Sequence, residues 1–195
     1  MPTELFAVTS ANRNSMLEVD LKWVDSLASE VVCRCGRVLQ PALIPNVFVP
    51  KAPRESEGVL AGADIRVLAV IDELLETICR DELESAFQIA RLMTKTGEVE
   101  NRTALIPRSE RQILLSSHQQ TVPPGTSGCK VCGNESCYEA GDFYIDEADW
   151  PVDGDVFSAT TDIIVSGRVL DDMKKASGFR KHYRVGITRI ERIEN

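Results

Sequence analysis

The stretch Cys129-Lys130-Val131-Cys132-Gly133 decides how this chain is organised. Two residues between its cysteines let both sulfur atoms converge on one metal ion, and the glycine permits the tight backbone that points amide N–H groups at thiolates. A second motif, Cys33-Arg34-Cys35-Gly36, lies in the first half of the chain. Structural zinc takes four thiolate or imidazole ligands in a tetrahedron. The two motifs therefore predict one structural Zn²⁺ that joins two halves of the protein, with the ligands Cys33, Cys35, Cys129 and Cys132.

The first motif has one residue fewer between its cysteines than zinc knuckles prefer, so the sequence leaves the exact ligand set open. Cys137 lies close enough to replace one ligand, and His118 is a more distant candidate. Cys79 follows an apolar stretch and is expected to be a buried small hydrophobic residue. A redox CxxC is the main competing interpretation. A thioredoxin-type CxxC normally follows a strand, whereas proline and glycine precede the CxxC of this chain.

Length and composition are typical of an ordinary folded protein. A chain of 195 residues with 43% hydrophobic and 27% charged residues predicts one compact domain over residues 1–195. No apolar run is long enough for a membrane helix and no secretory signal opens the sequence, so we expect a cytoplasmic protein whose cysteines are thiols or metal ligands. A net charge of -8 disfavours nucleic acid and favours a basic partner.

The first half, residues 1–100, is expected to alternate helices with extended chain. Helical patterns run through residues 17–32 and 66–80, and Asp81 is expected to cap a further helix over 82–95. Four prolines between positions 41 and 53 favour short strands and turns. The composition then turns polar, which predicts a linker at about 101–128.

The second half, residues 129–195, is expected to continue with a strand at 143–146. Ser166 is expected to cap a helix over 167–177, which Gly178 would end. The closing segment, 179–193, is rich in β-branched and aromatic residues and predicts a strand.

The two halves are expected to be related. Residues 64–67 (DIRV) precede the first helical stretch and residues 162–165 (DIIV) precede the last one. Gly36 lies 28 positions before Asp64, and Gly133 lies 29 positions before Asp162. The sequence thus predicts an α/β or α+β fold of two duplicated half-domains, each with short strands and a helix, around one metal site.

An acidic segment is the candidate partner-binding surface. Residues 135–155 hold eight acidic residues and no lysine or arginine, with aromatic residues interleaved. Aromatic anchors bordered by carboxylates are typical of tight interfaces. The residues predicted to bind a partner are Glu139, Asp142, Tyr144, Asp146, Glu147, Asp149, Trp150 and Asp153. The alternative is a solvated loop whose aromatic side chains turn into the core, with the basic residues between positions 180 and 192 balancing its charge.

The sequence lacks the usual signatures of catalysis. There is no GxGxxG, no phosphate-binding glycine-lysine loop, no GxSxG and no HExxH, and the chain has two histidines. We therefore expect that the protein is not an enzyme.

The second half resembles the bacterial double-CxxCG motif proteins, whose members include immunity proteins encoded beside polymorphic toxins. The resemblance rests on the motif at 129–133, on FYIDEADWPVDGDVF at 143–157 and on DIIVSGRVLDDMKKASGF at 162–179. It implies an immunity protein that binds and neutralises a cognate toxin, with zinc as scaffold, and the acidic charge is compatible with a basic toxin. The alternatives are a zinc-ribbon adaptor for nucleic acid, which the net charge disfavours, and a thiol or zinc enzyme with a reactive cysteine such as Cys137.

Overall fold

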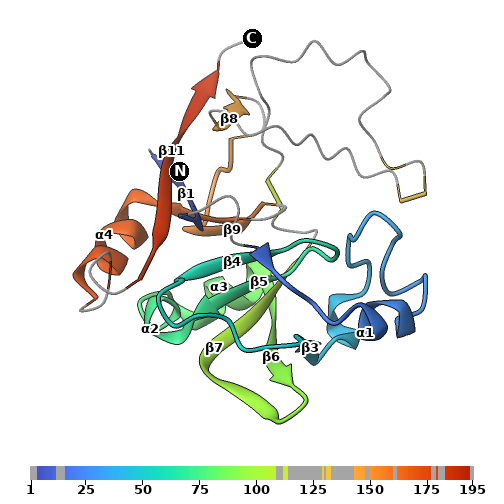
Figure 1. Cartoon of the computed structure of the whole chain (residues 1–195). Coiled ribbons are helices and arrows are strands. Elements are labelled where there is room, and N and C mark those ends of the chain that lie inside the picture. Colours follow the sequence, from blue (N-terminus) through green and yellow to red (C-terminus); the bar gives the residue numbers. More distant parts are fainter. Residues whose placement is uncertain are drawn as a thin grey trace.

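The fold is α+β, with two mixed sheets and few helices (Figure 1). The computed structural model describes residues 4–11, 16–108, 112–113, 129, 131–132, 143–147, 150–159, 162–176, 179 and 183–193. In Figure 1 the first-half sheet occupies the lower part of the view and the second-half sheet the upper part. Within the described ranges, no helix is long and apolar enough to cross a membrane.

The first-half sheet has the strand order β2-β4-β5-β7-β6-β3. Its strands are β2 (Met16–Leu17), β3 (Asn46–Phe48), β4 (Val59–Gly62), β5 (Leu68–Ile71), β6 (Phe87–Thr94) and β7 (Gly97–Pro107). Its helices are α1 (Leu21–Ser26), the 3-10 turn η1 (Pro41–Leu43), α2 (Asp72–Leu75) and α3 (Arg80–Ala86).

The second-half sheet has the order β8-β11-β1-β10-β9. Its strands are β1 (Leu5–Ser10), β8 (Phe143–Asp146), β9 (Val156–Ser158), β10 (Ile163–Ser166) and β11 (Val185–Ile193), with the helix α4 (Gly167–Lys175).

The two sheets share one topology. The order β4-β5-β7-β6-β3 in the first half corresponds to β9-β10-β1-β11-β8 in the second. In both series the first three neighbouring pairs are antiparallel and the last pair is parallel. A helix also directly follows the corresponding strands β5 and β10. This agreement in order, direction and connection is what a duplicated half-domain produces, and it supports the prediction of two related halves.

The second half takes one of its strands from the start of the sequence. β1 occupies the place that β7 occupies in the first half, between β10 and β11. The predicted half 129–195 therefore lacks a central strand of its own sheet. The predicted linker also begins too early, because β7 continues to Pro107 and buries Ala104, Leu105 and Ile106.

Corresponding positions occupy the same layer of the protein. Because side chains alternate along a strand, each sheet turns one face to a central core that both halves share and the other face to an outer core of its own. Corresponding pairs in the central core are Val59 and Val156, Leu68 and Ile163, Val70 and Val165, and Leu105 and Val8. Corresponding pairs in the outer cores are Leu60 and Phe157, Ala69 and Ile164, and Ala104 and Ala7.

This layering explains why two predicted helices contain strands. The helix predicted over 82–95 ends at Ala86, and β6 follows it. Phe87 faces the central core while Ala90 and Leu92 face the first outer core, so apolar residues occur on both faces of β6 and imitate helical spacing. The prediction over 66–80 is wrong for residues 68–71 for the same reason, since all four residues of β5 are buried, but it is right for residues 72–75, which form α2. Asp81 is not the N-cap of α3, because Cys79 occupies that position.

The helix predicted over 17–32 is also shorter than expected. The side chain of Asp20 accepts hydrogen bonds from the backbone N–H groups of Lys22 and Trp23, so α1 begins only at Leu21. Leu27 then adopts an extended backbone and ends the helix.

Elements with local signals match the sequence. Ser166 caps α4 through the N–H of Val169, as predicted, and the strands at 143–146 and 185–193 are present. Gly178 lies outside the described residues. The proposed match between residues 64–67 and 162–165 is out of register, because Ile163 corresponds to Leu68, whereas residues 64–67 form the turn before β5.

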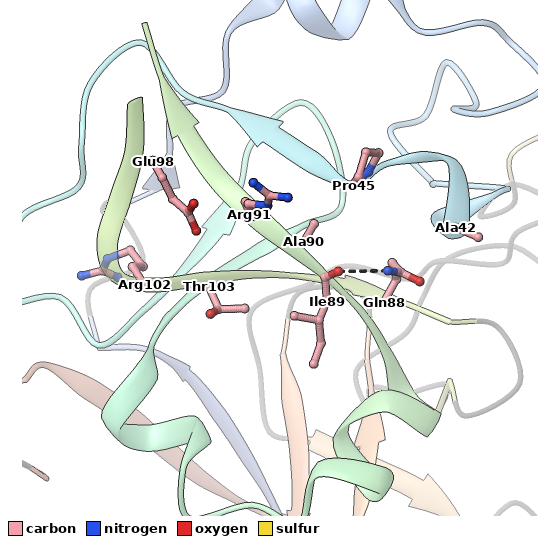
Figure 2. A pocket seen from close by; sticks show the side chains of 9 residues that line it. All are labelled: Ala42, Pro45, Gln88, Ile89, Ala90, Arg91, Glu98, Arg102 and Thr103. Carbon is pink, nitrogen blue, oxygen red and sulfur yellow. Dashed lines mark hydrogen bonds between the residues drawn. The ribbon is translucent and has the colours of Figure 1, made fainter. Parts of the chain in front are cut away.

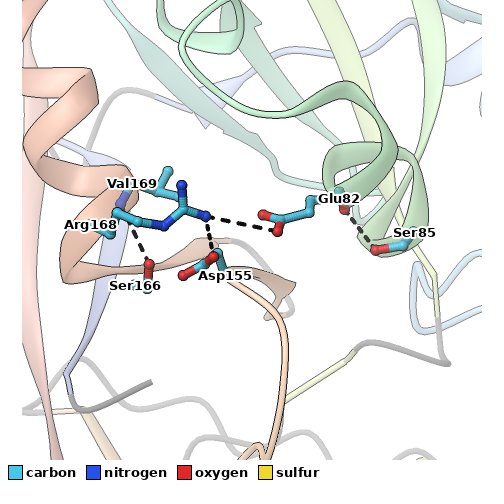
Figure 3. A network of polar contacts seen from close by, with 6 residues as sticks. All are labelled: Glu82, Ser85, Asp155, Ser166, Arg168 and Val169. Atoms are coloured by element: carbon cyan, nitrogen blue, oxygen red, sulfur yellow. Dashed lines mark hydrogen bonds and ion pairs between the residues drawn. The ribbon is translucent and has the colours of Figure 1, made fainter. Parts of the chain in front are cut away.

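Polar contacts join the two halves (Figure 3). The guanidinium of Arg168 on α4 pairs with Asp155 and lies 4.0 Å from the carboxylate of Glu82 on α3. Because the Arg168 side chain is 65% exposed, solvent screens this network and its contribution to stability is small. Backbone bonds add to it: the N–H of Gly58 donates to the carbonyl of Arg184 at 3.1 Å, and the N–H of Arg184 donates to Ser56 at 2.7 Å.

Candidate metal centre

The first cysteine motif forms the tip of a short hairpin. Val32 and Val38 form an antiparallel bridge, and the N–H of Cys33 donates to the carbonyl of Arg37 at 2.8 Å. The N–H of Gly36 donates to the carbonyl of Cys33 at 2.8 Å, and Gly36 has a φ of +81°. Only glycine adopts such a backbone without strain, so Gly36 lets a motif with a single intervening residue turn both sulfur atoms the same way.

The turn before β5 supports this motif from behind. The N–H of Arg66 donates to the carbonyl of Gly36 at 2.8 Å, and the backbone of Asp64 and Ile65 lies where a β-carbon of residue 36 would be. The sequence drew attention to residues 64–67 as part of a repeat, but no sequence signal indicated this supporting role.

The structure brings the four predicted ligands together. The Sγ atoms of Cys33 and Cys129 lie 3.6 Å apart, those of Cys35 and Cys132 lie 3.7 Å apart, and all four lie within 4.8 Å of one another. Four sulfur atoms at about 2.3 Å from one zinc ion would lie about 3.8 Å from each other in a regular tetrahedron. A disulfide would need about 2.05 Å. The spacing thus fits a metal ion held by four thiolates.

The cysteines pair across the cluster in the way that two duplicated half-domains predict. The first cysteine of one motif lies beside the first cysteine of the other, and the second beside the second. Asn46 of β3 follows Cys35 by 11 positions, and Phe143 of the corresponding strand β8 follows Cys132 by 11 positions. Each half-domain therefore contributes an equivalent knuckle to one shared site.

The thiols differ in their electrostatic surroundings. Hydrogen bonds from the backbone N–H groups of Cys132 and Val131 lower the pKa of Cys129 to about 6. Burial raises the pKa of Cys35 to about 12, and hydrogen bonds with neighbouring thiols add to this shift. Cys33 is buried and the other three thiols are partly exposed. Without metal, therefore, Cys129 loses its proton more easily than Cys35, and a divalent cation that binds to both thiols must displace the proton of Cys35.

The four sulfur atoms could hold one metal ion between them. Four thiolates around one metal ion would complete a tetrahedron and leave no position for a substrate or a water molecule, whereas catalytic zinc keeps one position open. The replacement ligands considered from the sequence, Cys137 and His118, lie outside the described residues.

Cys79 differs from the sequence expectation. It is exposed, because it is the N-cap of α3 and precedes the buried residues of that helix, Leu83 and Ala86. The prediction that it would be a buried hydrophobic residue is wrong.

The predicted partner-binding residues lie in several environments. Tyr144 is partly buried in β8, Asp146 ends that strand, and Glu147 and Asp153 are exposed. Glu139, Asp142 and Asp149 lie outside the described residues. The cluster as a binding surface remains a prediction.

Trp150 is not an accessible anchor. It is 7% exposed and packs in the second outer core with Ile145 and Phe157. The guanidinium of Arg192 lies 5.6 Å from the ring centroid of Trp150 and pairs with Glu147. The ring of Trp150 thus turns into the core, and a basic residue of the closing strand balances an acidic residue of the segment. For these residues, this agrees with the alternative interpretation, a solvated loop whose aromatic side chains turn inward.

The comparisons with known proteins leave the family open. A scan against protein-family models finds no match for this chain, and a search of curated proteins finds no similar sequence.

Proposed function

We propose that Cys33, Cys35, Cys129 and Cys132 bind one structural Zn²⁺, and that the chain acts as an immunity protein that neutralises a cognate bacterial toxin by binding it. The observation that carries the metal part is the convergence of two cysteine pairs from equivalent positions of two half-domains. Zinc is preferred because four thiolates in a tetrahedron suit its ligand preferences.

The closed ligand set supports binding rather than catalysis. The metal would hold the two knuckles together and thereby fix the two half-domains against each other. A binding protein needs such rigidity, because a preorganised surface loses less conformational entropy on association.

The immunity role rests on the resemblance of residues 129–190 to double-CxxCG proteins and on the net negative charge of the chain. A net charge of -8 would steer a basic toxin toward the protein and speed association. In this proposal the protein works in the bacterial cytoplasm and uses its acidic exposed groups for recognition.

Metal content tests the first part. Elemental analysis of purified protein should give about one zinc per chain, and both Cys33→Ser and Cys129→Ser should lose it. Cys79→Ser is the matched control, because Cys79 is exposed and lies outside the cluster. Zinc retained without Cys33 would rule out a site shared by both motifs.

Growth rescue tests the second part. The tagged chain is used to capture proteins from a lysate of its source strain, and any captured toxin domain is then expressed in a neutral host. Survival that requires co-expression of the chain would support the immunity role. A toxin domain that kills equally with and without the chain would contradict it.

A further inference from the structure

The pairing of β6 with β7 is interrupted at one place. The strands are in register from Phe87 opposite Pro107 to Arg91 opposite Thr103, and they resume with Met93 opposite Glu98. Residue 92 therefore lies opposite residues 99–102, and Asn101 within this bulge has a φ of +58°. Bulges and left-handed non-glycine residues are costly and concentrate at functional sites.

The interruption lies beside a pocket of about 330 Å³ (Figure 2). Small-molecule sites begin at about this size. Its polar lining comes from Gln88, Arg91, Glu98, Arg102 and Thr103, and its apolar wall comes from η1, the segment before β3, and β6. Of these polar residues, Arg102 belongs to the bulge, and Glu98 and Thr103 flank it.

Arg102 is a buried cation without a full set of partners. It is 6% exposed, and its Nη2 donates to the carbonyl oxygens of Arg54 at 3.1 Å and Glu57 at 2.6 Å. Among the described residues its Nη1 has no hydrogen-bond partner, and no carboxylate forms an ion pair with it, although Glu57 and Asp72 act on it from a longer distance. Burial lowers the pKa of Arg102, which reflects the cost of keeping this charge inside the protein.

The fold does not require a cation at this position. Arg102 lies opposite Ile71 in the first-half sheet. In the second-half sheet Leu5 lies opposite Ser166, so Leu5 is the residue that corresponds to Arg102. Leu5 is fully buried in the second outer core and pairs in register with Ile190. In the second half, therefore, an apolar residue in a regular strand occupies the corresponding position. The buried arginine and the bulge beside it are therefore additions specific to the first half.

Two opposite charges face the pocket without pairing. Arg91 and Glu98 are both exposed, and neither forms an ion pair or side-chain hydrogen bond with another described residue. Figure 2 shows Glu98 extending from β7 toward the strand that carries Arg91. In contrast, Thr103 donates to Asp72 at 2.7 Å and Gln88 accepts from Arg108 at 2.8 Å, so those side chains are already engaged.

We propose that this pocket binds a free α-amino acid. The ligand carboxylate would pair with Arg91, and the ligand ammonium would pair with Glu98. A zwitterion fits better than a simple anion because the two free groups have opposite charges on neighbouring strands. Arg102 lines the same pocket, and its positive charge, which Glu57 and Asp72 offset in part, adds a preference for an amino acid with an acidic side chain. This proposal is independent of the metal and of the immunity role.

Isothermal titration of the zinc-loaded protein with each of the twenty standard amino acids tests the proposal. At least one should bind, and the affinity for it should fall at least tenfold in Arg91→Gln and in Glu98→Gln. Both side chains are exposed, so thermal unfolding should show that the variants remain folded. Lys174→Gln, an exposed cation on α4 in the other half, should leave the affinity unchanged.

Analogues of the bound amino acid then separate its two charges. The analogue without the carboxylate and the analogue without the amine should each bind at least tenfold more weakly. Binding of none of the twenty at about 10 mM, the upper limit for a weak site, would overturn the proposal. So would equal binding by the analogue without the amine, or by inorganic phosphate, because either result would describe a simple anion site.

Discussion

Gly36 lies so close to Asp64 that a β-carbon at Gly36 would be 2.7 Å from the carbonyl oxygen of Asp64. Together with its φ of +81°, this contact makes Gly36 the residue that fixes the first cysteine motif against the turn before β5.

The variant Gly36→Ala should therefore unfold more easily and bind zinc more weakly. Strain in the left-handed region costs about 1–3 kcal/mol, and the contact with a backbone atom adds to it because a backbone cannot move aside as a side chain can. Urea denaturation of the zinc-loaded protein measures the loss. Gly97→Ala is the matched control: its φ is +142°, but a β-carbon there would meet nothing within 4 Å. Equal losses in the two variants would show that the contact with Asp64 is unimportant.

The sequence could predict the metal site because its chemistry is local. Cys129 and Cys132 indicate a knuckle by their spacing alone, and Ser166 indicates the start of α4 by its type and by the apolar face that follows. The pairing of the two motifs also followed from simple ligand counting. The spacing of the first motif, with Arg34 as the single residue between its cysteines, is explained only by the backbone of Gly36.

The sheets could not be predicted in the same way, because they depend on partners far apart in the chain. No local pattern shows that Leu5 lies opposite both Ser166 and Ile190. Phe87 and Leu92 lie on opposite faces of β6, each against a different core, so their spacing carries no strand signal. Burial on both faces removed the alternation on which strand prediction relies.

Metal should protect four cysteines from alkylation and leave Cys79 reactive. At pH 7 in the metal-free protein, Cys129 is mostly thiolate because its pKa is lowered to about 6, whereas Cys35 is a thiol because its pKa is raised to about 12. Since the thiolate is the nucleophile, iodoacetamide should modify Cys129 well before Cys35, and lowering the pH through about 6 should slow the reaction of Cys129.

Peptide mass spectrometry with and without one equivalent of zinc measures these rates. Zinc should slow modification at Cys33, Cys35, Cys129 and Cys132 together, while exposed Cys79 reacts equally in both samples. Protection confined to the second motif would contradict a site shared by the two halves.

The strand β1 should be essential to the second half although it is distant from it in sequence. β1 lies between β10 and β11, and Leu5, Ala7 and Val8 are fully buried. Burying a leucine or valine contributes about 1.5–3 kcal/mol. Loss of Leu5 and Val8 alone therefore removes about 3–6 kcal/mol, which is comparable with the whole stability of a typical domain at about 5–15 kcal/mol.

Deleting residues 1–10 should thus leave a chain with an unfolded second-half sheet, and a synthetic peptide of residues 1–11 added in excess should restore it. Tryptophan fluorescence reports the change, because Trp150 and Leu5 belong to the same outer core, and circular dichroism reports the sheet. A peptide that carries Leu5→Asp and Ala7→Asp is the control and should not rescue, since it would bury two carboxylates. A deleted chain that melts within a few degrees of the full chain would show that β1 is dispensable and that the correspondence between β1 and β7 has no energetic meaning.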